Sequence, residues 1–207
     1  IKSELGIISG KNTPNKLIIQ KVSKNDNIVL EGVEFQLWLK SDGQEKANTY
    51  QTDKNGRITV QRLAPGTYCY QESKTLDGYI LDSTVREFTV ASDGKINGQT
   101  SITITVENDY IKLDLSKVDA STGGYVAGAK MALYKGEEKV ASWTSGNSAY
   151  RIEKIAAGEY TLVEEAAPNG YQLAESITFT VVNKAEVQSI SMKNLKYTDL
   201  TVVKKIK

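Results

Sequence analysis

Short runs of alternating apolar and polar residues recur along the chain, and turn residues separate them. Runs of this kind that are rich in β-branched and aromatic residues predict strands. No segment has the period of a long amphipathic helix. The clearest runs are KLIIQKV, VEFQLWL, GRITVQRL, TYCYQE, REFTVA and TSITITVEN. We therefore predict an all-β protein.

The pattern repeats at a long interval, and such a repeat predicts tandem domains. KVSKNDNIVLEGVEFQLW matches KVDASTGGYVAGAKMALY, with Gly32 and Gly128 at the same place in each copy. APGTYCYQESKTLDGY likewise matches AAGEYTLVEEAAPNGY, and the segments ITITVENDY and QSISMKNLK close the copies. We predict two homologous domains, at residues 16–109 and 110–196.

The segments outside the two copies are interpreted separately. Residues 1–15 match neither copy and are interpreted as a linker or the tail of a preceding unit. Residues 197–207 are interpreted as a linker and the start of a third unit, because TDLTVVKKIK places Lys204 where the first copy has Lys21. We expect Lys204 to remain unbonded, since its partner strand would lie beyond this segment.

Composition excludes several classes of function. The net charge is +1, from 26 basic and 25 acidic residues spread along the chain, so no basic stripe for nucleic acid or an anionic membrane is present. No run approaches the ~20 apolar residues of a membrane span, and the segment shows no signal peptide. A single cysteine, Cys69, and the absence of histidine exclude an internal disulfide, Ser-His-Asp and Cys-His catalysis and histidine-zinc sites. We expect no metal or other cofactor.

In each copy, three strands have a run of core-facing residues, and alternation places one polar residue at the end of each run. One interpretation is that each marks a strand end, where the side chain turns into water. The same three residue types recur, however, in the same order and parity in both copies, and a buried lysine-glutamate pair alone carries a large desolvation cost. The residues are Lys21, Glu72 and Asn108 in the first copy and Lys117, Glu164 and Asn194 in the second.

These three residue types can carry out a specific reaction when they are buried together. Burial lowers the pKa of a lysine and raises the pKa of a glutamate. A neutral amine is a nucleophile, and a protonated carboxyl can polarise an amide and move a proton to the leaving group. With an asparagine carboxamide between them, the amine can displace ammonia and leave a Lys-Asn isopeptide bond, which requires only close packing and no cofactor.

The stretch YTLVEEAAPNGY resembles the E-box of Gram-positive pilins, whose pattern is Tyr-x-Leu-x-Glu-Thr-x-Ala-Pro-x-Gly-Tyr. Together with the Lys-Val-Asp opening, the Gly-Ala pair and the closing asparagine, it makes each unit similar to a Cna protein B-type, SpaA-like domain. This resemblance covers nearly the whole chain. It implies tandem β-sandwiches of immunoglobulin-like or prealbumin-like type. It also implies a bond between Lys117 and Asn194, with Glu164 as the catalytic residue.

The first copy departs from the family pattern, since it opens with KVSKND and has Leu76 where the E-box has proline. Its glutamate, glycine and tyrosine remain. By position, the resemblance implies a bond from Lys21 to Asn108, catalysed by Glu72. Three neighbouring residues could be confused with the site residues, namely Lys24, Asp109 and, with outward parity, Glu165.

The resemblance implies a structural protein, not an enzyme, that forms part of a pilus shaft or adhesin stalk on the cell wall of a Gram-positive bacterium. The implied partners are neighbouring domains of the same surface protein or pilin subunits assembled by a sortase. The alternative is an adhesin module whose loops recognise a host extracellular matrix protein or a carbohydrate. Shaft and stalk remain open, because the chain has neither a Tyr-Pro-Lys-Asn pilin motif nor a sorting signal.

Other residues with chemical potential have simpler interpretations. TDKNGRI has an Asp-x-Asn-Gly pattern but lacks the acidic residue that closes a calcium loop, so Asn55-Gly56 predicts a hairpin turn. We expect Cys69 to be a small packing residue rather than a reactive thiol. Trp38 and Trp143 are expected to pack in the core or between domains, with carbohydrate binding as the alternative. The polar stretch SWTSGNSAY indicates no particular chemistry.

Overall fold

The computed structural model describes residues 13–198. Over this range the chain forms fourteen strands and one short 3₁₀ helix, which confirms the all-β prediction. The proposed third-unit residue Lys204 lies outside the described residues, as do residues 1–12. The chain divides into two compact units, one up to Leu76 and from Leu81 to Asn108, the other from Asp77 to Ile80 and from Asp109 onward.

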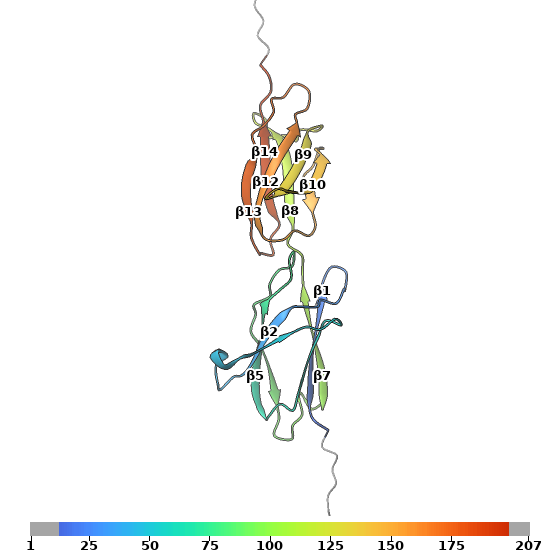
Figure 1. The fold of residues 1–207 in the computed structure, drawn as a ribbon, viewed down its shortest axis with the longest axis vertical. Coiled ribbons are helices and arrows are strands. Elements are labelled where there is room, and N and C mark those ends of the chain that lie inside the picture. The colour runs from blue at the N-terminus through green and yellow to red at the C-terminus, as the bar shows by residue number, and fades with distance from the viewer. Residues whose placement is uncertain (1–12, 199–207) are drawn as a thin grey trace, which may run out of the picture. The chain divides into compact units, whose positions relative to one another are not determined.

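The first unit consists of two β-sheets (Figure 1). The three-stranded sheet has the order β4-β1-β7, with bounds Arg57–Gln61, Lys16–Ser23 and Ser101–Asn108. The four-stranded sheet has the order β3-β2-β5-β6, with bounds Asn48–Gln51, Glu34–Leu39, Gly66–Lys74 and Arg86–Val90. The 3₁₀ helix Gln44–Lys46 joins β2 to β3.

The second unit repeats this topology strand by strand. Its three-stranded sheet has the order β11-β8-β14, with bounds Tyr150–Ile152, Leu113–Asp119 and Gln188–Asn194. Its four-stranded sheet has the order β10-β9-β12-β13, with bounds Glu138–Thr144, Lys130–Lys135, Gly158–Ala166 and Ile177–Val181. The sequence repeat is therefore a repeat of fold, and each unit is a β-sandwich as predicted.

The first and last strands of each unit are hydrogen-bonded neighbours and run parallel. In the first unit β1 pairs with β7, from Lys16 opposite Ser101 to Ser23 opposite Asn108. In the second unit β8 pairs with β14, from Leu113 opposite Gln188 to Asp119 opposite Asn194. All other pairings between the named strands are antiparallel. The strand that enters a unit thus lies directly beside the strand that leaves it.

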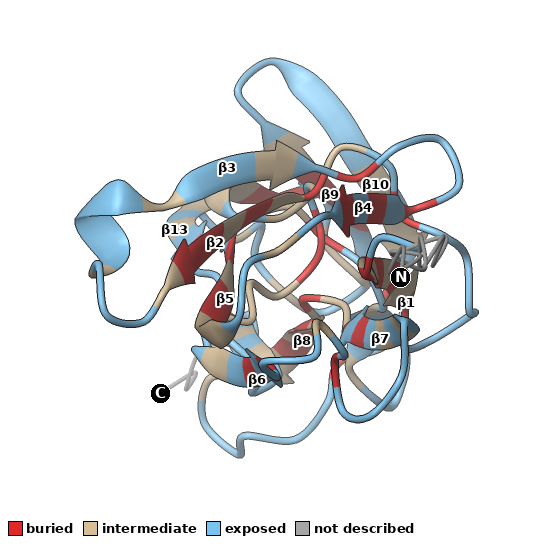
Figure 2. Ribbon diagram, turned by 90° about the horizontal axis from the view of Figure 1, so that it is seen from below, coloured by how far each residue is buried: buried red, intermediate tan, exposed pale blue. Residues whose placement is uncertain are grey.

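Burial alternates along these strands as the sequence pattern predicts (Figure 2). In β8 every second residue is buried, and the intervening residues are partly exposed. The core of the second unit includes Leu113, Leu115, Leu133 and Leu162, each at most 2% exposed. Each of these side chains stabilises the fold by about 1.5–3 kcal/mol through removal from water.

A glycine with positive φ follows the first strand in each unit. Gly32 has φ +85° and Gly128 has φ +94°, a backbone conformation that residues with a Cβ rarely adopt. A Cβ at Gly32 would lie 3.7 Å from the Leu76 side chain, and one at Gly128 would lie 3.5 Å from Pro168. Leu76 thus occupies, beside this glycine, the place that the E-box proline takes in the second unit. The leucine that replaces the E-box proline in the first unit therefore preserves the contact with the glycine.

The hairpin predicted at Asn55-Gly56 is wrong, although the turn itself is present. The Gly56 N–H donates to the Asp53 carbonyl at 2.8 Å. The Asp53 carboxylate accepts hydrogen bonds from the N–H groups of Asn55 and Arg57 at 2.8 and 2.9 Å. The flanking strands β3 and β4 belong to different sheets, however. The turn is therefore an arch between the two layers of the sandwich.

Candidate functional site

The first unit brings its three predicted site residues together in the core. Lys21 comes from β1, Asn108 from β7 and Glu72 from β5, so both sheets contribute. Register places Lys21 opposite Val106 and Ser23 opposite Asn108, which makes Lys21 and Asn108 diagonal neighbours on the inner face. All three residues are buried: Lys21 is 0% exposed, Glu72 is 1% exposed and Asn108 is 2% exposed.

The three side chains of the first unit contact one another directly. The Lys21 amine donates to Asn108 Oδ1 at 2.5 Å. The Asn108 carboxamide nitrogen donates to Glu72 Oε1 at 2.6 Å. Glu72 Oε2 lies 3.2 Å from Lys21 Nζ, an ion-pair distance without hydrogen-bond geometry. One carboxylate oxygen therefore faces the amide and the other faces the amine.

A fourth residue, Thr75, completes this cluster and was not identified from the sequence. It is the first residue after β5. Its hydroxyl accepts a second hydrogen bond from the Asn108 carboxamide nitrogen at 2.7 Å. Both N–H bonds of the carboxamide are thereby engaged, one by Glu72 and one by Thr75.

The second unit assembles the same three residue types with a different set of contacts. Asn194 Nδ2 donates to both Glu164 oxygens, Oε1 at 2.8 Å and Oε2 at 3.1 Å. Glu164 Oε2 also accepts the Ala174 N–H at 2.7 Å. Lys117 Nζ lies 3.3 Å from Glu164 Oε1. Among the described residues, neither Lys117 Nζ nor Asn194 Oδ1 has a hydrogen-bond partner.

Burial is the main cause of the pKa shifts of the two lysines and of Glu72. It lowers the pKa of Lys21 and of Lys117, and attraction to the neighbouring glutamate only partly opposes this effect. Burial likewise raises the pKa of Glu72 against the opposing effects of Lys21 and the Asn108 hydrogen bond. Both shifts favour the neutral amine and the protonated carboxyl. These are the protonation states in which an amine attacks and a carboxyl donates a proton.

The strand-end interpretation is wrong for the six residues, because all of them are at most 3% exposed. The neighbours that could be confused with them lie elsewhere. Lys24 is exposed, and Asp109 is partly exposed and pairs with Lys112 at 3.2 Å. Glu165 faces outward as predicted and pairs with Lys139 at 2.5 Å on the surface. Parity thus distinguished the buried residues from their neighbours.

Comparison with known proteins identifies the family. The SpaA prealbumin-like fold domain matches the chain twice, at residues 15–109 and 111–196. The chain belongs to this family. The resemblance drawn from the E-box is therefore confirmed, and each sandwich is a SpaA domain.

Several proteins are similar to this chain at modest sequence identity. Colossin-A of Dictyostelium discoideum is 24% identical over 167 residues, which is 68% of this chain but 1% of that protein. The Bacillus anthracis TIE protein has a TM-score of 0.54 at 23% identity, covering 89% of this chain and 34% of that one. A C-terminal fragment of the pilus adhesin SpaC from Lactobacillus rhamnosus GG has a TM-score of 0.52 at 20% identity, covering 90% and 100%. These likenesses support the fold.

Asp119, the last residue of the Lys-Val-Asp opening, organises the second SpaA domain around the site. Its carboxylate accepts the N–H groups of Ser121 and Thr122 at 2.8 and 2.9 Å and the Tyr171 hydroxyl at 2.9 Å. These hydrogen bonds hold the pKa of Asp119 well below its usual range. They join the opening motif to the last residue of the E-box. The first domain has Ser23 at this position.

The first tyrosine of each E-box also has a structural partner that the sequence did not reveal. The Tyr68 hydroxyl donates to the Ala64 carbonyl at 3.1 Å, and the Tyr160 hydroxyl donates to the Ala156 carbonyl at 2.9 Å. Each bond spans four residues and closes the turn before the E-box strand. The recurrence of Ala and Tyr at the same spacing in both copies is the signal that could have indicated it.

The remaining candidates have packing roles in the described part of the chain. Cys69 and Trp38 lie opposite each other in the β2-β5 register, and both are buried. Burial raises the pKa of the Cys69 thiol. Trp143 stacks on Tyr150 with ring centroids 4.4 Å apart. Residues 13–198 contain no group of three or more metal-binding side chains and no helix that is long and apolar enough to cross a membrane.

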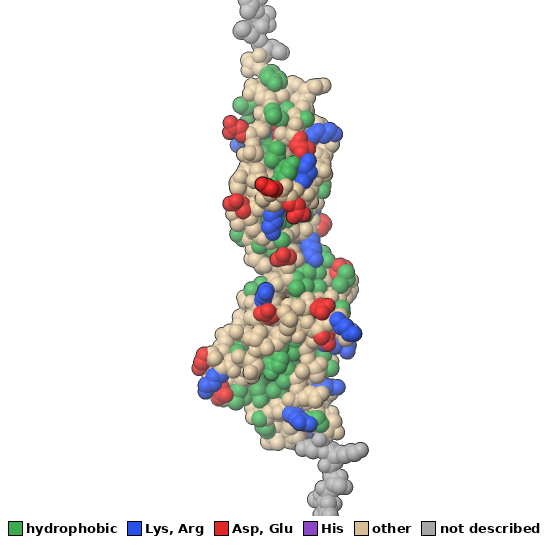
Figure 3. Space-filling view, viewed as in Figure 1, with side chains coloured by type: hydrophobic (Ala, Val, Ile, Leu, Met, Phe, Trp, Pro, Cys, Tyr) green, Lys and Arg blue, Asp and Glu red, His purple; other side chains and the backbone are tan. Residues whose placement is uncertain are grey.

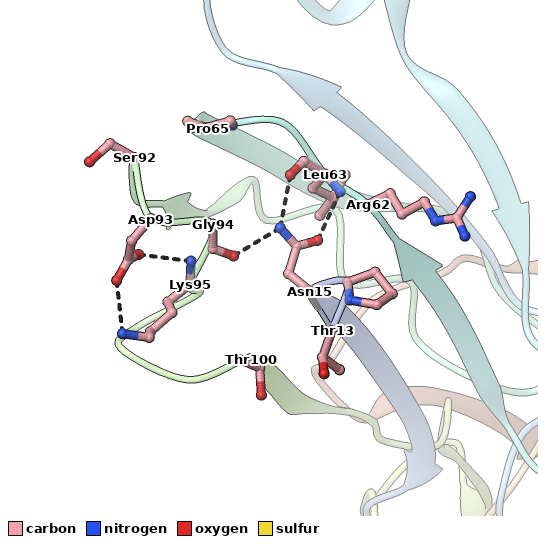
Figure 4. Close-up of a pocket in the computed structure, with 11 residues that line it drawn as sticks. Thr13, Asn15, Arg62, Leu63, Pro65, Ser92, Asp93, Gly94, Lys95 and Thr100 are labelled. Carbon is pink, nitrogen blue, oxygen red and sulfur yellow. Dashed lines mark hydrogen bonds and ion pairs between the residues drawn. The ribbon is translucent and has the colours of Figure 1, made fainter. Parts of the chain in front are cut away.

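The face of residues 13–198 that is in view shows no large patch of a single charge (Figure 3). Basic and acidic side chains are interspersed on the visible face of each domain (Figure 3). A hollow in the first domain surrounds Asn15, whose carboxamide donates to the carbonyls of Leu63 and Gly94 and accepts the Leu63 N–H (Figure 4). Asp93 and Lys95 at its rim pair with each other at 2.9 Å. Asn15 therefore ties two loops together.

Proposed function

We propose that this chain is part of a pilus shaft or adhesin stalk on a Gram-positive cell surface, in which each SpaA domain is locked by an autocatalytic Lys-Asn isopeptide bond. The observation that carries the proposal is the buried lysine, glutamate and asparagine cluster, which occurs twice at equivalent positions. Two buried lysine-glutamate clusters would carry a large desolvation cost in a purely structural core, which their pairing offsets only in part. A self-processing reaction accounts for their presence.

The reaction is an intramolecular transamidation. The neutral lysine Nζ attacks the asparagine Cγ, and the protonated glutamate polarises the carboxamide. The glutamate then transfers a proton from the attacking nitrogen to Nδ2, the Cγ–Nδ2 bond breaks and ammonia leaves. An amine and a primary amide thus become a secondary amide and ammonia, and the glutamate returns to its starting state. In the first domain the transfer is short, since Asn108 Nδ2 already lies 2.6 Å from Glu72 Oε1.

The surroundings of each cluster suit this reaction. In the first domain Phe35 lies opposite the glutamate and Val106 lies opposite the lysine. In the second domain Met131 and Met192 occupy the same two positions. All four are at most 4% exposed, so they shield the reacting atoms from water. Packing holds the groups in contact, which replaces a bimolecular encounter with an intramolecular one.

The bond would also determine how each domain bears a load. In the first domain, force applied at the domain's two ends enters through β1 and leaves after β7. These strands are parallel, and Lys21 and Asn108 both lie near their C-terminal ends. A bond between the two side chains would carry the force directly from one strand to the other. The intervening residues 22–107 would remain unloaded, as suits a stalk under tension.

The test is the intact mass of the purified chain, followed by peptide mapping of cross-linked fragments. We expect the mass to be lower than the sequence mass by two ammonia molecules. Glu72→Ala and Glu164→Ala should each restore one of them, and the outward-facing Glu165→Ala should restore neither. A wild-type chain with the full sequence mass would refute the isopeptide proposal.

A ligand-binding adhesin module is the second candidate. The Trp143-Tyr150 stack favours it, because Tyr150 is 37% exposed and stacked aromatic rings can bind sugars or peptides. We would titrate the chain with oligosaccharides and matrix proteins while following tryptophan fluorescence, with Trp143→Leu as the comparison. A saturable change that Trp143→Leu abolishes would support this role, and its absence would leave the structural role alone.

A further inference from the structure

Thr75 is a point of chemical difference between two otherwise similar clusters. It and Ala167 both follow directly after the E-box strand of their domain. The E-box resemblance has alanine at this position, so the first domain carries an additional hydroxyl beside its reacting groups. That hydroxyl lies 2.7 Å from Asn108 Nδ2.

The asparagine is held differently in the two domains. In the first domain the Nδ2 group divides its hydrogen bonds between Glu72 and Thr75, and the oxygen Oδ1 accepts from Lys21 at 2.5 Å. In the second domain, where no such hydroxyl is present, Asn194 Nδ2 contacts both oxygens of Glu164. Its Oδ1 there has no hydrogen-bond partner among the described residues.

This difference also changes how the carboxyl group is used. In the first domain Glu72 Oε1 faces the amide nitrogen, and Oε2 is left to face the amine at 3.2 Å. In the second domain a single oxygen, Glu164 Oε1, lies nearest to both the amine and the amide nitrogen. In the first domain one oxygen of Glu72 can therefore take a proton from the amine while the other gives a proton to the amide nitrogen. Each oxygen already faces the group with which it would exchange the proton.

We propose that the Thr75 hydroxyl is a positioning group for bond formation in the first domain, which it promotes by holding the Asn108 carboxamide with Oδ1 toward Lys21 and Nδ2 toward Glu72. This proposal rests on the proposed isopeptide reaction. It accounts for a domain with a divergent E-box that nonetheless holds its reacting groups in close contact. Thr75 acts on the geometry of Asn108 through its hydrogen bond to the carboxamide nitrogen.

The test follows the rate at which each bond forms in newly synthesised full-length chains. Cell-free translation is stopped after a short pulse, samples are quenched in acid at intervals, and peptide mapping reports the bonded fraction of each domain. The variants are Thr75→Ala and Thr75→Ser, and the second-domain bond in the same molecule is the internal control. The second domain already folds with alanine at this position, so Thr75→Ala is a conservative choice.

We expect Thr75→Ala to slow the first-domain bond by about fivefold, the effect of one hydrogen bond on a rate. Thr75→Ser, which keeps the hydroxyl, should recover a rate within about twofold of the wild type. Equal rates in Thr75→Ala and wild type would overturn the proposal, and so would equal slowing in both variants, since the methyl group would then be responsible. A wild-type chain that never loses ammonia from its first domain would instead refute the isopeptide reaction itself.

Discussion

The sharpest test of the second domain exchanges one oxygen of its buried glutamate for nitrogen. Glu164→Gln keeps the volume and removes the acid, so we expect no bond between Lys117 and Asn194. Glu165→Gln is the matched control, because it makes the same change at the next residue, whose side chain is 40% exposed. The two variants differ from each other only in the face of β12 on which the change falls.

The expected loss of stability follows from the size of the loop that the bond closes. Residues 117 and 194 differ by 77 positions (194 − 117), and closing a loop of this size lowers the unfolded-state entropy by the equivalent of about 4.5 kcal/mol. For a domain of this size each kcal/mol shifts the midpoint by about 4–8 °C. The second-domain transition should therefore fall by roughly 20–35 °C in Glu164→Gln.

The assay is differential scanning calorimetry of the full chain, with intact mass measured on the same samples. Glu165→Gln should retain the wild-type mass deficit and a midpoint within a few degrees of wild type. A Glu164→Gln chain that still loses both ammonia molecules would refute the catalytic role of the glutamate. A Glu164→Gln chain that lacks the bond but has the same unfolding midpoint as the Glu165→Gln control would refute the loop-closure estimate.

Three further predictions concern residues outside the two clusters. Asp119→Asn should destabilise the chain at pH 7. The difference in stability between this variant and the wild type should shrink below about pH 4, because a carboxyl whose pKa is depressed in the folded state contributes stability that is lost as the pH falls. Urea unfolding midpoints of both chains at pH 7 and at about pH 2.5 measure this difference. Gly56→Ala should lower the free energy of unfolding, measured in urea, by about 1–3 kcal/mol more than Gly98→Ala does. Both glycines have positive φ, but only at Gly56 would a Cβ lie 2.6 Å from the Lys21 carbonyl oxygen. Equal losses of stability in the two variants would contradict the predicted clash. Cys69 should react with a thiol reagent far more slowly in the native chain than in denaturant, because it is buried and its pKa is raised; equal rates would show that the thiol is accessible.

Much of the candidate site followed from the period of two along the strands. Alternation assigns each residue to a face, so Lys117 in line with Leu113 and Leu115 was predicted to point inward, and it does. The same rule separated Glu164 from Glu165. The internal repeat supplied an independent check, because the same three residue types recur in the same order and parity in both copies.

Contacts between strands were not available from that pattern. Alternation gives a side chain's face but not the strand that lies beside it or the register of the pair. The arch at Asn55-Gly56 was therefore expected to be a hairpin, since a tight turn looks the same whether its strands share a sheet or not. The link from Asp119 to Tyr171 joins residues 52 positions apart and was likewise absent from the local pattern.

The sequence by itself determined the all-β class, the repeat and the inward face of six polar residues, because these depend on periods along one strand. Only the tertiary structure decided that the first and last strands are parallel neighbours, that Leu76 occupies the place of the E-box proline and that Thr75 contacts Asn108. These contacts join residues far apart in the chain. They arise when two sheets pack at a fixed register, which no single strand specifies.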